Sequence, residues 1–356
     1  MAIIGNSFLG LRDIYKGTDG KGDVADIIDI LAQTNSILTD VVTRPCNMKT
    51  KHKHTIRNGL PEVVWGQLYR GIPASKSERT QVEDTTGFLE GLSQVDVRLG
   101  EIEENLDAFR LQEAHSYLEA ISQEWARAIF YESETANSDR ITGLAPRFSK
   151  LSSDTAEIGS QIIDCGGTGG NNTSLWFITH GMDSFHLIYP SGTNGGIMRE
   201  DHGKQNVTDA DGRRYYAYEE TFRVHTGGCV RDWRKIVRLA NIDSDRLRTA
   251  PDNLDGNGNS IYDFMRRGYY QLHGKRRVDF GTPGGSPDGN FAMGSTCIYA
   301  NRDVLEALDA LGTNAGASDN FVRLKPMEVQ GMEVDTYRGM KISQVDQIVN
   351  TEARVT

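Results

Sequence analysis

The longest uninterrupted pattern in this chain is a helical one, between about residues 105 and 131. That stretch contains neither Gly nor Pro, and its apolar residues recur at spacings of three and four. They are Leu111, Ala114, Leu118, Ile121, Trp125 and Ala128. At 1.5 Å per residue such a helix is about 40 Å long, and its apolar stripe covers too few turns for a coiled coil. We therefore expect one long helix that lies across a sheet.

The segment before this helix, residues 37–99, has the pattern of paired strands. Short β-rich runs alternate with turn residues, and we expect strands at 37–42, 51–57, 62–69, 85–90 and 93–98. These runs hold too few large apolar residues to build a core, and an isolated hairpin is marginally stable in water. The segment is therefore predicted to be a long hairpin that lies on another surface.

Charges along this predicted hairpin are sorted by sign. Residues 48–79 are mainly basic and residues 80–104 mainly acidic. The basic residues are Lys49, Lys51, Lys53, Arg57, Arg70, Lys76 and Arg79, and the acidic ones include Glu83, Asp84, Glu90 and Asp96. One interpretation is that the two limbs pair with each other within the hairpin. The other is that the basic limb meets an acidic surface on a neighbouring copy, and the two can hold together.

The composition narrows the class of protein. The chain has 39 Lys and Arg against 49 Asp and Glu, a net charge of −10, which argues against a broad basic face that grips nucleic acid. No apolar run approaches the roughly 20 residues of a membrane span. Gly is frequent, at 38 residues, and Pro scarce, at 9, which favours a folded chain with many turns and loops. Residues 1–6 lack the features of a secretory signal, so we expect folding in the compartment of synthesis.

The remainder of the chain mixes strands and helices, which predicts an α+β fold. At the N-terminal side, Asp23–Gln33 has the spacing of a short amphipathic helix that must dock on something to be stable. Beyond residue 166 we expect strands at 175–179, 185–189, 215–218, 229–239, 296–300, 327–334 and 340–348, helices at 263–272 and 302–311, and loops at 190–214 and 281–290.

Candidate sites for chemistry are weak. The four cysteines, Cys46, Cys165, Cys229 and Cys297, lie far apart in the sequence and are expected to be free thiols without zinc or disulfides. The glycine run 166–170 lacks the ending of a phosphate-binding loop. The acidic segment Asp252–Asp263 resembles a calcium loop, but Phe264 stands where a bidentate glutamate is needed. We expect no cofactor and no catalytic residues.

The histidines leave one alternative open. His180, His186 and His202, with acidic residues nearby in sequence, would suit a metal-dependent hydrolase, although their spacing does not present two ligands to one ion. His52 and His54 alternate on a predicted strand, but Lys51 and Lys53 beside them are expected to repel a metal. The sequence predicts no metal site.

Several stretches resemble a known family. They are Thr55–Pro61 (TIRNGLP), Val64–Gly71 (VWGQLYRG), Ser75–Ser77 with Gln81, Gly143–Phe148 (GLAPRF), Ile298–Arg302 (IYANR) and Tyr337–Ile342 (YRGMKI) with Val345 and Asp346. With the order of arm, hairpin, long helix and mixed sheet, the chain resembles the major capsid proteins of tailed double-stranded DNA bacteriophages, which have the Hong Kong 97 shell fold. Within that group it looks most like the coat proteins of short-tailed phages.

The resemblance implies a domain assignment. Residues 1–36 would be the N-terminal arm, and residues 37–99 the extended loop (E-loop) hairpin with flanking strands of the peripheral domain. Residues 100–165 would carry the peripheral domain with its spine helix. Residues 166–356 would form the axial domain and the returning peripheral strands.

The resemblance also implies function and partners. The chain would assemble with itself as pentamers and hexamers into an icosahedral shell in the bacterial cytoplasm. This shell would enclose double-stranded DNA without sequence-specific contacts and would become part of the virion. Scaffolding, portal and decoration proteins would be partners, and no membrane would be involved. The predicted inter-subunit contacts are Trp65, Leu68, Tyr69, Arg70, Lys76, Arg79, Glu83 and Asp84. An encapsulin-like compartment shell is the alternative with the same fold.

Overall fold

A computed structural model describes residues 33–66, 68–102, 106–209, 211–273, 293–313, 325–329 and 332–356. The predicted arm helix, apart from Gln33, and the predicted loop at 281–290 lie outside these residues. The chain divides into two compact units. The first contains residues 88–125 and 194–225, and the second contains residues 34–87, 126–193 and 226–356. No helix in the described ranges is long and apolar enough to cross a membrane.

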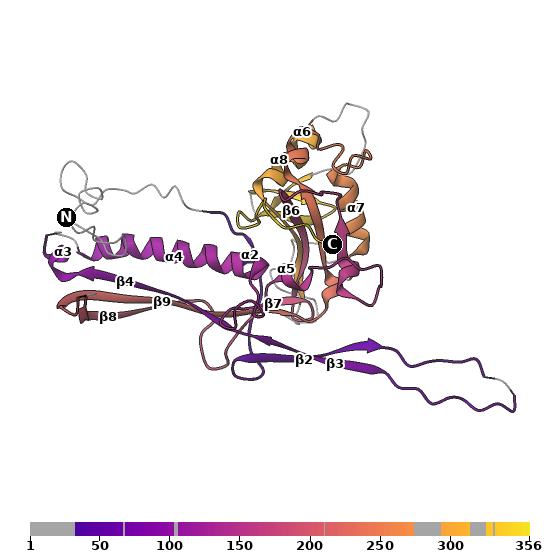
Figure 1. Cartoon of the computed structure of the whole chain (residues 1–356), viewed down its shortest axis with the longest axis horizontal. Helices are drawn as coiled ribbons and strands as arrows, with labels where there is room; N and C mark the ends of the chain where they lie inside the picture. The colour runs from indigo at the N-terminus through magenta and orange to yellow at the C-terminus, as the bar shows by residue number, and fades with distance from the viewer. Residues whose placement is uncertain are drawn as a thin grey trace. The chain divides into compact units, whose positions relative to one another are not determined.

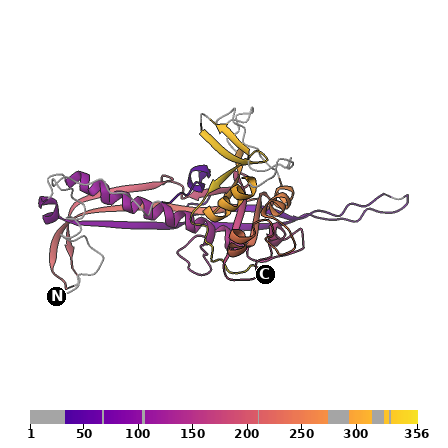
Figure 2. The same ribbon diagram turned by 90° about the horizontal axis from the view of Figure 1, so that it is seen from above.

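The first unit is built on the predicted long helix. Helix α4 (Leu106–Tyr131) runs alongside strands β4 (Gly87–Asp96) and β9 (Arg214–Val230) (Figures 1 and 2). Its apolar stripe packs on β9, where the Tyr117 ring stacks on Phe222 with centroids 5.6 Å apart. On β4, a side chain at Gly91 would meet the Tyr117 ring at 3.0 Å, so glycine lets the helix approach the strand. The expectation of a helix across a sheet is confirmed.

One predicted loop is a strand. Residues 197–208 form β8 (Ile197–Thr208), which pairs with β9 in register from Ile197 opposite Val224 to Thr208 opposite Arg214. The loop prediction for 190–214 was wrong there because most β8 side chains are exposed, and backbone pairing to β9 forms the strand without an apolar face. The short helix α3 (Val97–Ile102) follows β4.

The second unit has a mixed sheet with β6 (Asn172–Gly181) at its centre. β10 (Ile236–Asp243) and β11 (Met293–Ala300) flank β6, both antiparallel to it. On one side, β5 (Ile162–Asp164) lies next to β10 and is parallel to it. On the other side, β14 (Met340–Gln344) lies next to β11 and is parallel to it, and β13 (Met332–Tyr337) and then β12 (Lys325–Val329) extend the sheet from β14. Every β6 residue is buried, so the strand reads as a continuous run instead of an alternation.

Short helices complete this unit. They are α5 (Leu144–Arg147), α6 (Ser244–Thr249), α7 (Ile261–Gln271), α8 (Arg302–Thr313) and the 3-10 turns η1 (Ile158–Gln161) and η2 (Trp233–Lys235). Phe264 of α7 and Leu308 of α8 are buried in one apolar core with Phe177 of β6. The helices predicted at 263–272 and 302–311 are confirmed to within two residues at each end.

A buried ion pair ties the last residues to this sheet. The guanidinium of Arg238 on β10 donates to the Glu352 carboxylate at 2.8 Å and to the Ser174 hydroxyl at 3.0 Å. It also lies over the Trp176 ring, 5.0 Å from the centroid. Tyr131 at the end of α4 donates to the same carboxylate at 2.5 Å. One buried charge pair therefore joins strand, helix and C-terminal segment.

The remaining described strands of this unit are β7 (Phe185–Tyr189), β1 (Thr43–Pro45) and the two strands of the hairpin. β7 pairs in parallel with β1 and antiparallel with the end of β9. The hairpin consists of β2 (Lys51–Gly59) and β3 (Glu78–Thr85), which pair only with each other among the described strands (Figure 1).

Several strand predictions near the hairpin were wrong. Residues 37–40 form the short helix α2 (Ile37–Asp40), with Ile37 buried and Ser36 donating to the Gln344 carbonyl at 3.1 Å. The described residues of 62–69 are not in a strand, because no strand in the described ranges pairs with them. The runs 85–90 and 93–98 are largely one strand, β4, and η2 interrupts the run 229–239.

Candidate assembly interface

The hairpin has a paired part and an unpaired tip. Its strands are in register from Lys51 opposite Thr85 to Gly59 opposite Glu78, with an irregularity between Arg57 and Gly59. Lys53 pairs with Glu83 across the strands at 3.0 Å, and Lys51 approaches the same carboxylate at 3.9 Å. These pairs confirm that basic and acidic limbs meet within the hairpin. Residues 60–77, which we name the hairpin tip, connect the strands.

The described side chains of the hairpin tip are strongly apolar and exposed. Trp65 is 97%, Leu68 90% and Val63 89% exposed. Leu60, Tyr69 and Ile72 are also exposed. Isolated apolar side chains on a surface are common, but a contiguous set of this kind marks an interaction site. The predicted contact residues Trp65, Leu68 and Tyr69 therefore lie where a partner can reach them.

Positive side chains accompany this apolar set. Arg70, Lys76 and Arg79 are exposed on or beside the hairpin tip. Tyr69 has a φ of 65°, in the left-handed region, which costs free energy for a residue with a Cβ. The tip is thus an apolar strip with a basic rim, the arrangement in which charges select a partner and apolar groups supply affinity.

Asp84 does not belong to this surface. It is buried at the other end of the hairpin, where the Arg147 guanidinium donates to its carboxylate at 2.7 Å. Arg147 also donates to the Thr142 and Gly228 carbonyls, both at 3.2 Å. The contact predicted for Asp84 is therefore replaced by an internal ion pair. Sequence reasoning missed Arg147 because it is far from the hairpin in sequence.

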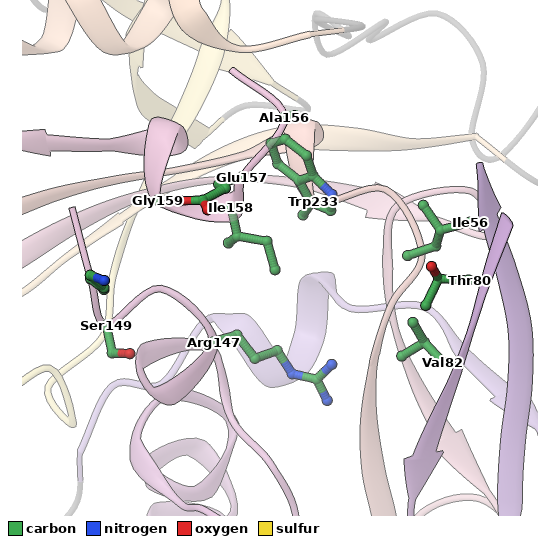
Figure 3. Close-up of a pocket in the computed structure, with 11 residues that line it drawn as sticks. Ile56, Thr80, Val82, Arg147, Ser149, Ala156, Glu157, Ile158, Gly159 and Trp233 are labelled. Carbon is green, nitrogen blue, oxygen red and sulfur yellow. The ribbon is translucent and has the colours of Figure 1, made fainter. Parts of the chain in front are cut away.

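A hollow of about 400 Å³ lies between the hairpin and the body of the second unit. Figure 3 shows Ile56, Thr80 and Val82 of the hairpin on one side, Ile158 and Trp233 on the other, and Arg147 reaching between them. The lining brings together apolar groups and few titratable ones. It has the character of a packing gap under the hairpin and not of a reaction site.

The structure does not bring the three histidines of the hydrolase alternative together. His180 is buried, with its Nε2 2.6 Å from the Tyr299 hydroxyl, and His202 bonds Thr221 in the other unit. In the described part of the chain, the groups that could hold a metal contain neither of them. Burial lowers the pKa of both His180 and His186 to about 4.

The calcium-like segment is held by its own hydrogen bonds. The Asp255 carboxylate accepts from the Asn257 and Asn259 backbone amides at 2.8 and 3.2 Å, and Asn253 accepts from the Gly258 amide at 2.7 Å. A hydrogen bond from the Asn259 side chain, together with the two backbone amides that donate to Asp255, lowers the pKa of Asp255 to about 2. The loop needs no ion to explain its fold.

Comparison with known proteins identifies the family of this chain. Residues 19–356 match the family of major capsid protein GP7. The chain belongs to this family. The capsid structure of bacteriophage Epsilon15 has 30% sequence identity and a TM-score of 0.75, covering 100% of both chains. A search of curated proteins finds no match.

More distant capsid and shell structures also match. The bacteriophage JBD30 capsid decorated with minor capsid protein trimers has 10% identity and a TM-score of 0.43, over 88% of this chain and 90% of that one. The SrpI encapsulin of Synechococcus elongatus has 8% identity and a TM-score of 0.41, over 65% and 96%. These weak likenesses add nothing to the family assignment.

The GP7-family protein is therefore the major capsid protein of a tailed phage, and it forms the icosahedral shell of the virion. Its mixed α+β fold matches the Hong Kong 97-like capsids. Proteins of this family are structural, so the chain is not an enzyme, and the alternative of a metal-dependent hydrolase is excluded. Membership of a phage capsid family also argues against the alternative of an encapsulin-like compartment shell.

Proposed function

We propose that the hairpin tip lies on the neighbouring subunit of the shell, and that this overlap joins the copies into pentamers and hexamers. The contact residues at or beside the tip are Trp65, Leu68, Tyr69, Arg70, Lys76 and Arg79. Glu83 is a further proposed contact, exposed near the base of the hairpin. The observation that carries the proposal is the near-complete exposure of Trp65 and Leu68 in one chain. A second copy is the occupant, because a closed shell repeats every surface and supplies the same partner to each tip.

The gain on covering the tip is large enough to matter for assembly. An aromatic side chain buries about 150–250 Å², which at roughly 25 cal/mol per Å² gives about 4–6 kcal/mol as an upper bound. Part of this gain is lost to the ordering of the tip and to the association itself. Trp65 and Tyr69 are therefore expected to act as anchors that fill pockets on the neighbour.

The finer domain assignment belongs to the same proposal. The hairpin corresponds to the E-loop, α4 to the spine helix of the peripheral domain, and the mixed sheet around β6 to the axial domain. Residues 1–36 are assigned to the N-terminal arm, and at its described end Thr34 and Ser36 bond to Asp346 and Gln344 of their own chain. Scaffolding, portal and decoration proteins complete the partners, and the shell expands from a precursor as double-stranded DNA enters.

The test removes the apolar anchors and keeps the hairpin. A variant with Trp65→Ala, Leu68→Ala and Tyr69→Ala leaves β2, β3 and their ion pairs unchanged. We expect purified protein with unaltered circular dichroism but no shells in negative-stain electron microscopy, and a small species on size-exclusion chromatography. The control Glu62→Gln changes the same segment without removing apolar area and should assemble. Normal shells from the triple variant would overturn the proposal.

A further inference from the structure

Side chains with metal-binding atoms meet at the base of the hairpin, away from the tip. His52 and His54 come from β2, Asp84 from β3, His186 from β7 and Cys229 from the end of β9. The ligand atoms of His52, His186 and Cys229 all lie within 4.8 Å of one another, and so do those of His54, Asp84 and Cys229. All five residues belong to the second unit. We name this group the root cluster.

The strands explain why these residues converge. His186 on β7 is the register partner of Cys229 on β9, and directly opposite side chains of an antiparallel pair lie about 4.5–5.5 Å apart at Cβ. His52 and His54 alternate on β2, so both point to the same face. The His52 ring meets the His186 ring edge-on, with centroids 5.6 Å apart. The cluster therefore joins the hairpin to the β7–β9 pair.

Several polar atoms of the root cluster lack partners, although the Cys229 thiol lies 3.9 Å from His54 Nδ1 and the Asp84 carboxylate pairs with Arg147. His186 is fully buried, and neither of its ring nitrogens makes a hydrogen bond within the usual geometric limits. The buried Nδ1 of His52 and Nε2 of His54 are also unpartnered. Each buried polar group left without a partner destabilises the folded state, so several in one place indicate a missing ligand.

The imidazoles of His52, His54 and His186 each have a buried ring nitrogen without a hydrogen-bond partner. The nearby carboxylate of Asp84 is already paired with Arg147 at 2.7 Å. A neutral imidazole is the form that binds a metal ion.

We propose that the root cluster binds a Zn²⁺ ion through His52, His186 and Cys229. Imidazole and thiolate together are the ligands that zinc prefers. Tetrahedral zinc, with bonds of about 2.0–2.1 Å to nitrogen and 2.3 Å to sulfur, places its ligand atoms roughly 3.3–3.8 Å apart. The 4.8 Å limit on the observed separations requires only small side-chain shifts. On binding, the Cys229 thiol releases its proton to solvent and the thiolate bonds the metal.

The charges around the cluster permit a cation. Lys51 and Lys53 alternate with the two histidines and lie on the opposite face, where Lys53 pairs with Glu83 at 3.0 Å. The expectation that these lysines would repel a metal therefore does not fit the geometry. Arg231, which faces His52 and His186, donates to the Met182 carbonyl at 3.1 Å and approaches Asp183 at 3.7 Å. Arg44 faces the same two histidines, and the Asp84 carboxylate acts on His52 in the opposite direction. Burial and Asp84 raise the pKa of the Cys229 thiol, so its proton leaves only when the metal binds.

The bound ion would fix the base of the hairpin. β2 and β3 pair with no other described strand, so no strand ladder joins the hairpin to the neighbouring sheet. A metal that bridges β2, β7 and β9 adds a link that side-chain packing does not supply. The role is structural and is separate from the contacts of the hairpin tip.

The experiment measures metal in the full-length protein. Protein prepared with added ZnSO₄ and then desalted is expected to hold close to one zinc per chain by inductively coupled plasma mass spectrometry. Cys229→Ser and His186→Gln are expected to hold less than about a tenth of that amount. The matched controls Cys165→Ser and His202→Gln change a buried cysteine and a histidine outside the cluster, and should retain it.

A second measurement covers variants that do not fold. In the unmodified protein, Co²⁺ is added in place of zinc, and the visible spectrum is recorded. A thiolate-to-cobalt charge-transfer band with intense tetrahedral d–d bands, both lost on adding excess Zn²⁺, is the expected result. Metal-free protein after zinc loading, a cobalt spectrum without the thiolate band, or equal zinc in Cys229→Ser would each overturn the site.

Discussion

At the scale of single residues, a buried polar chain around His180 links sheet and N-terminal segment. His180 Nε2 lies 2.6 Å from the Tyr299 hydroxyl, which in turn donates to Asp40 at 3.1 Å. Asp40 is paired with Lys341 at 2.9 Å. Burial keeps His180 neutral, so its protonation opposes the folded state.

The first prediction concerns pH. Because the pKa of His180 falls from 6.5 to about 4 on folding, the unfolded chain binds more protons between these values. Stability is therefore full above pH 6.5 and decreases as the pH falls towards 4, by about 2 kcal/mol at pH 5 from this residue. Thermal unfolding at pH 7.5 and 5.0 should show a smaller decrease for His180→Gln than for the unmodified protein. The exposed His202→Gln is the control, and equal decreases in all three would contradict the prediction.

Individual residues also show which positions could be predicted from the sequence and which could not. The exposure of Trp65, Leu68 and Tyr69 followed from a segment with too few apolar neighbours to form a core. Asp84 was misplaced because its partner Arg147 is 63 positions away, and no local pattern marks that pairing. Lys51 and Lys53, adjacent in sequence, argued against a metal at His52 and His54. The sequence did not place His186, Cys229 or Asp84 near these histidines, because those residues are far away along the chain.

At the scale of elements, α4 packs on β9 through one apolar cluster. Phe222 is fully buried in it and stacks on Tyr117. Val224 of the same strand also belongs to this cluster.

The second prediction tests that contact. Phe222→Ala should destabilise the protein by about 3–5 kcal/mol, because it leaves a cavity under the helix. Urea unfolding followed by circular dichroism measures the change. Tyr216→Ala, a half-exposed ring on the same strand, should cost less than about 1 kcal/mol. Similar losses for the two variants would show that the helix does not depend on this site.

The sequence predicted an element correctly where a periodic apolar pattern was long, and wrongly where pairing with a distant strand determines the structure. Helix α4 carries its own periodicity over many residues, so the sequence predicts it almost to the residue. β8 has no apolar face and forms only because β9 offers a backbone partner. The described residues of 62–69 have β-forming side chains but no partner strand, and they remain irregular.

At the scale of the whole molecule, charge should control how copies meet. The net charge of −10 makes subunits repel one another, whereas Arg70 and Lys76 lie in the hairpin tip and Arg79 beside it. If this basic rim meets an acidic surface of the neighbour, as proposed, the contact offsets the repulsion at close range.

The third prediction follows from this balance. Lys76→Gln with Arg79→Gln should slow shell formation several-fold at low salt, and the difference from the unmodified protein should shrink as salt screens the charges. Light scattering during assembly at several NaCl concentrations measures both effects. Arg213→Gln with Arg214→Gln makes the same change of charge away from the tip and serves as the control. A rate unaffected by the first pair would contradict the role of the rim.

The ion pair between Arg147 and Asp84 fixes the base of the hairpin, and this has a consequence for how far the tip can move. An extended chain rises about 3.3 Å per residue, so Trp65 can lie up to roughly 45 Å from Lys51. If the hairpin tilts by about 10° at its base, the Trp65 indole at this distance moves by roughly 8 Å, which is more than the width of an aromatic ring. Subunits at positions of different shell curvature could then place Trp65 in the same pocket of the neighbour. This would need only a small rotation of the hairpin near Arg147 and no change in the sheets.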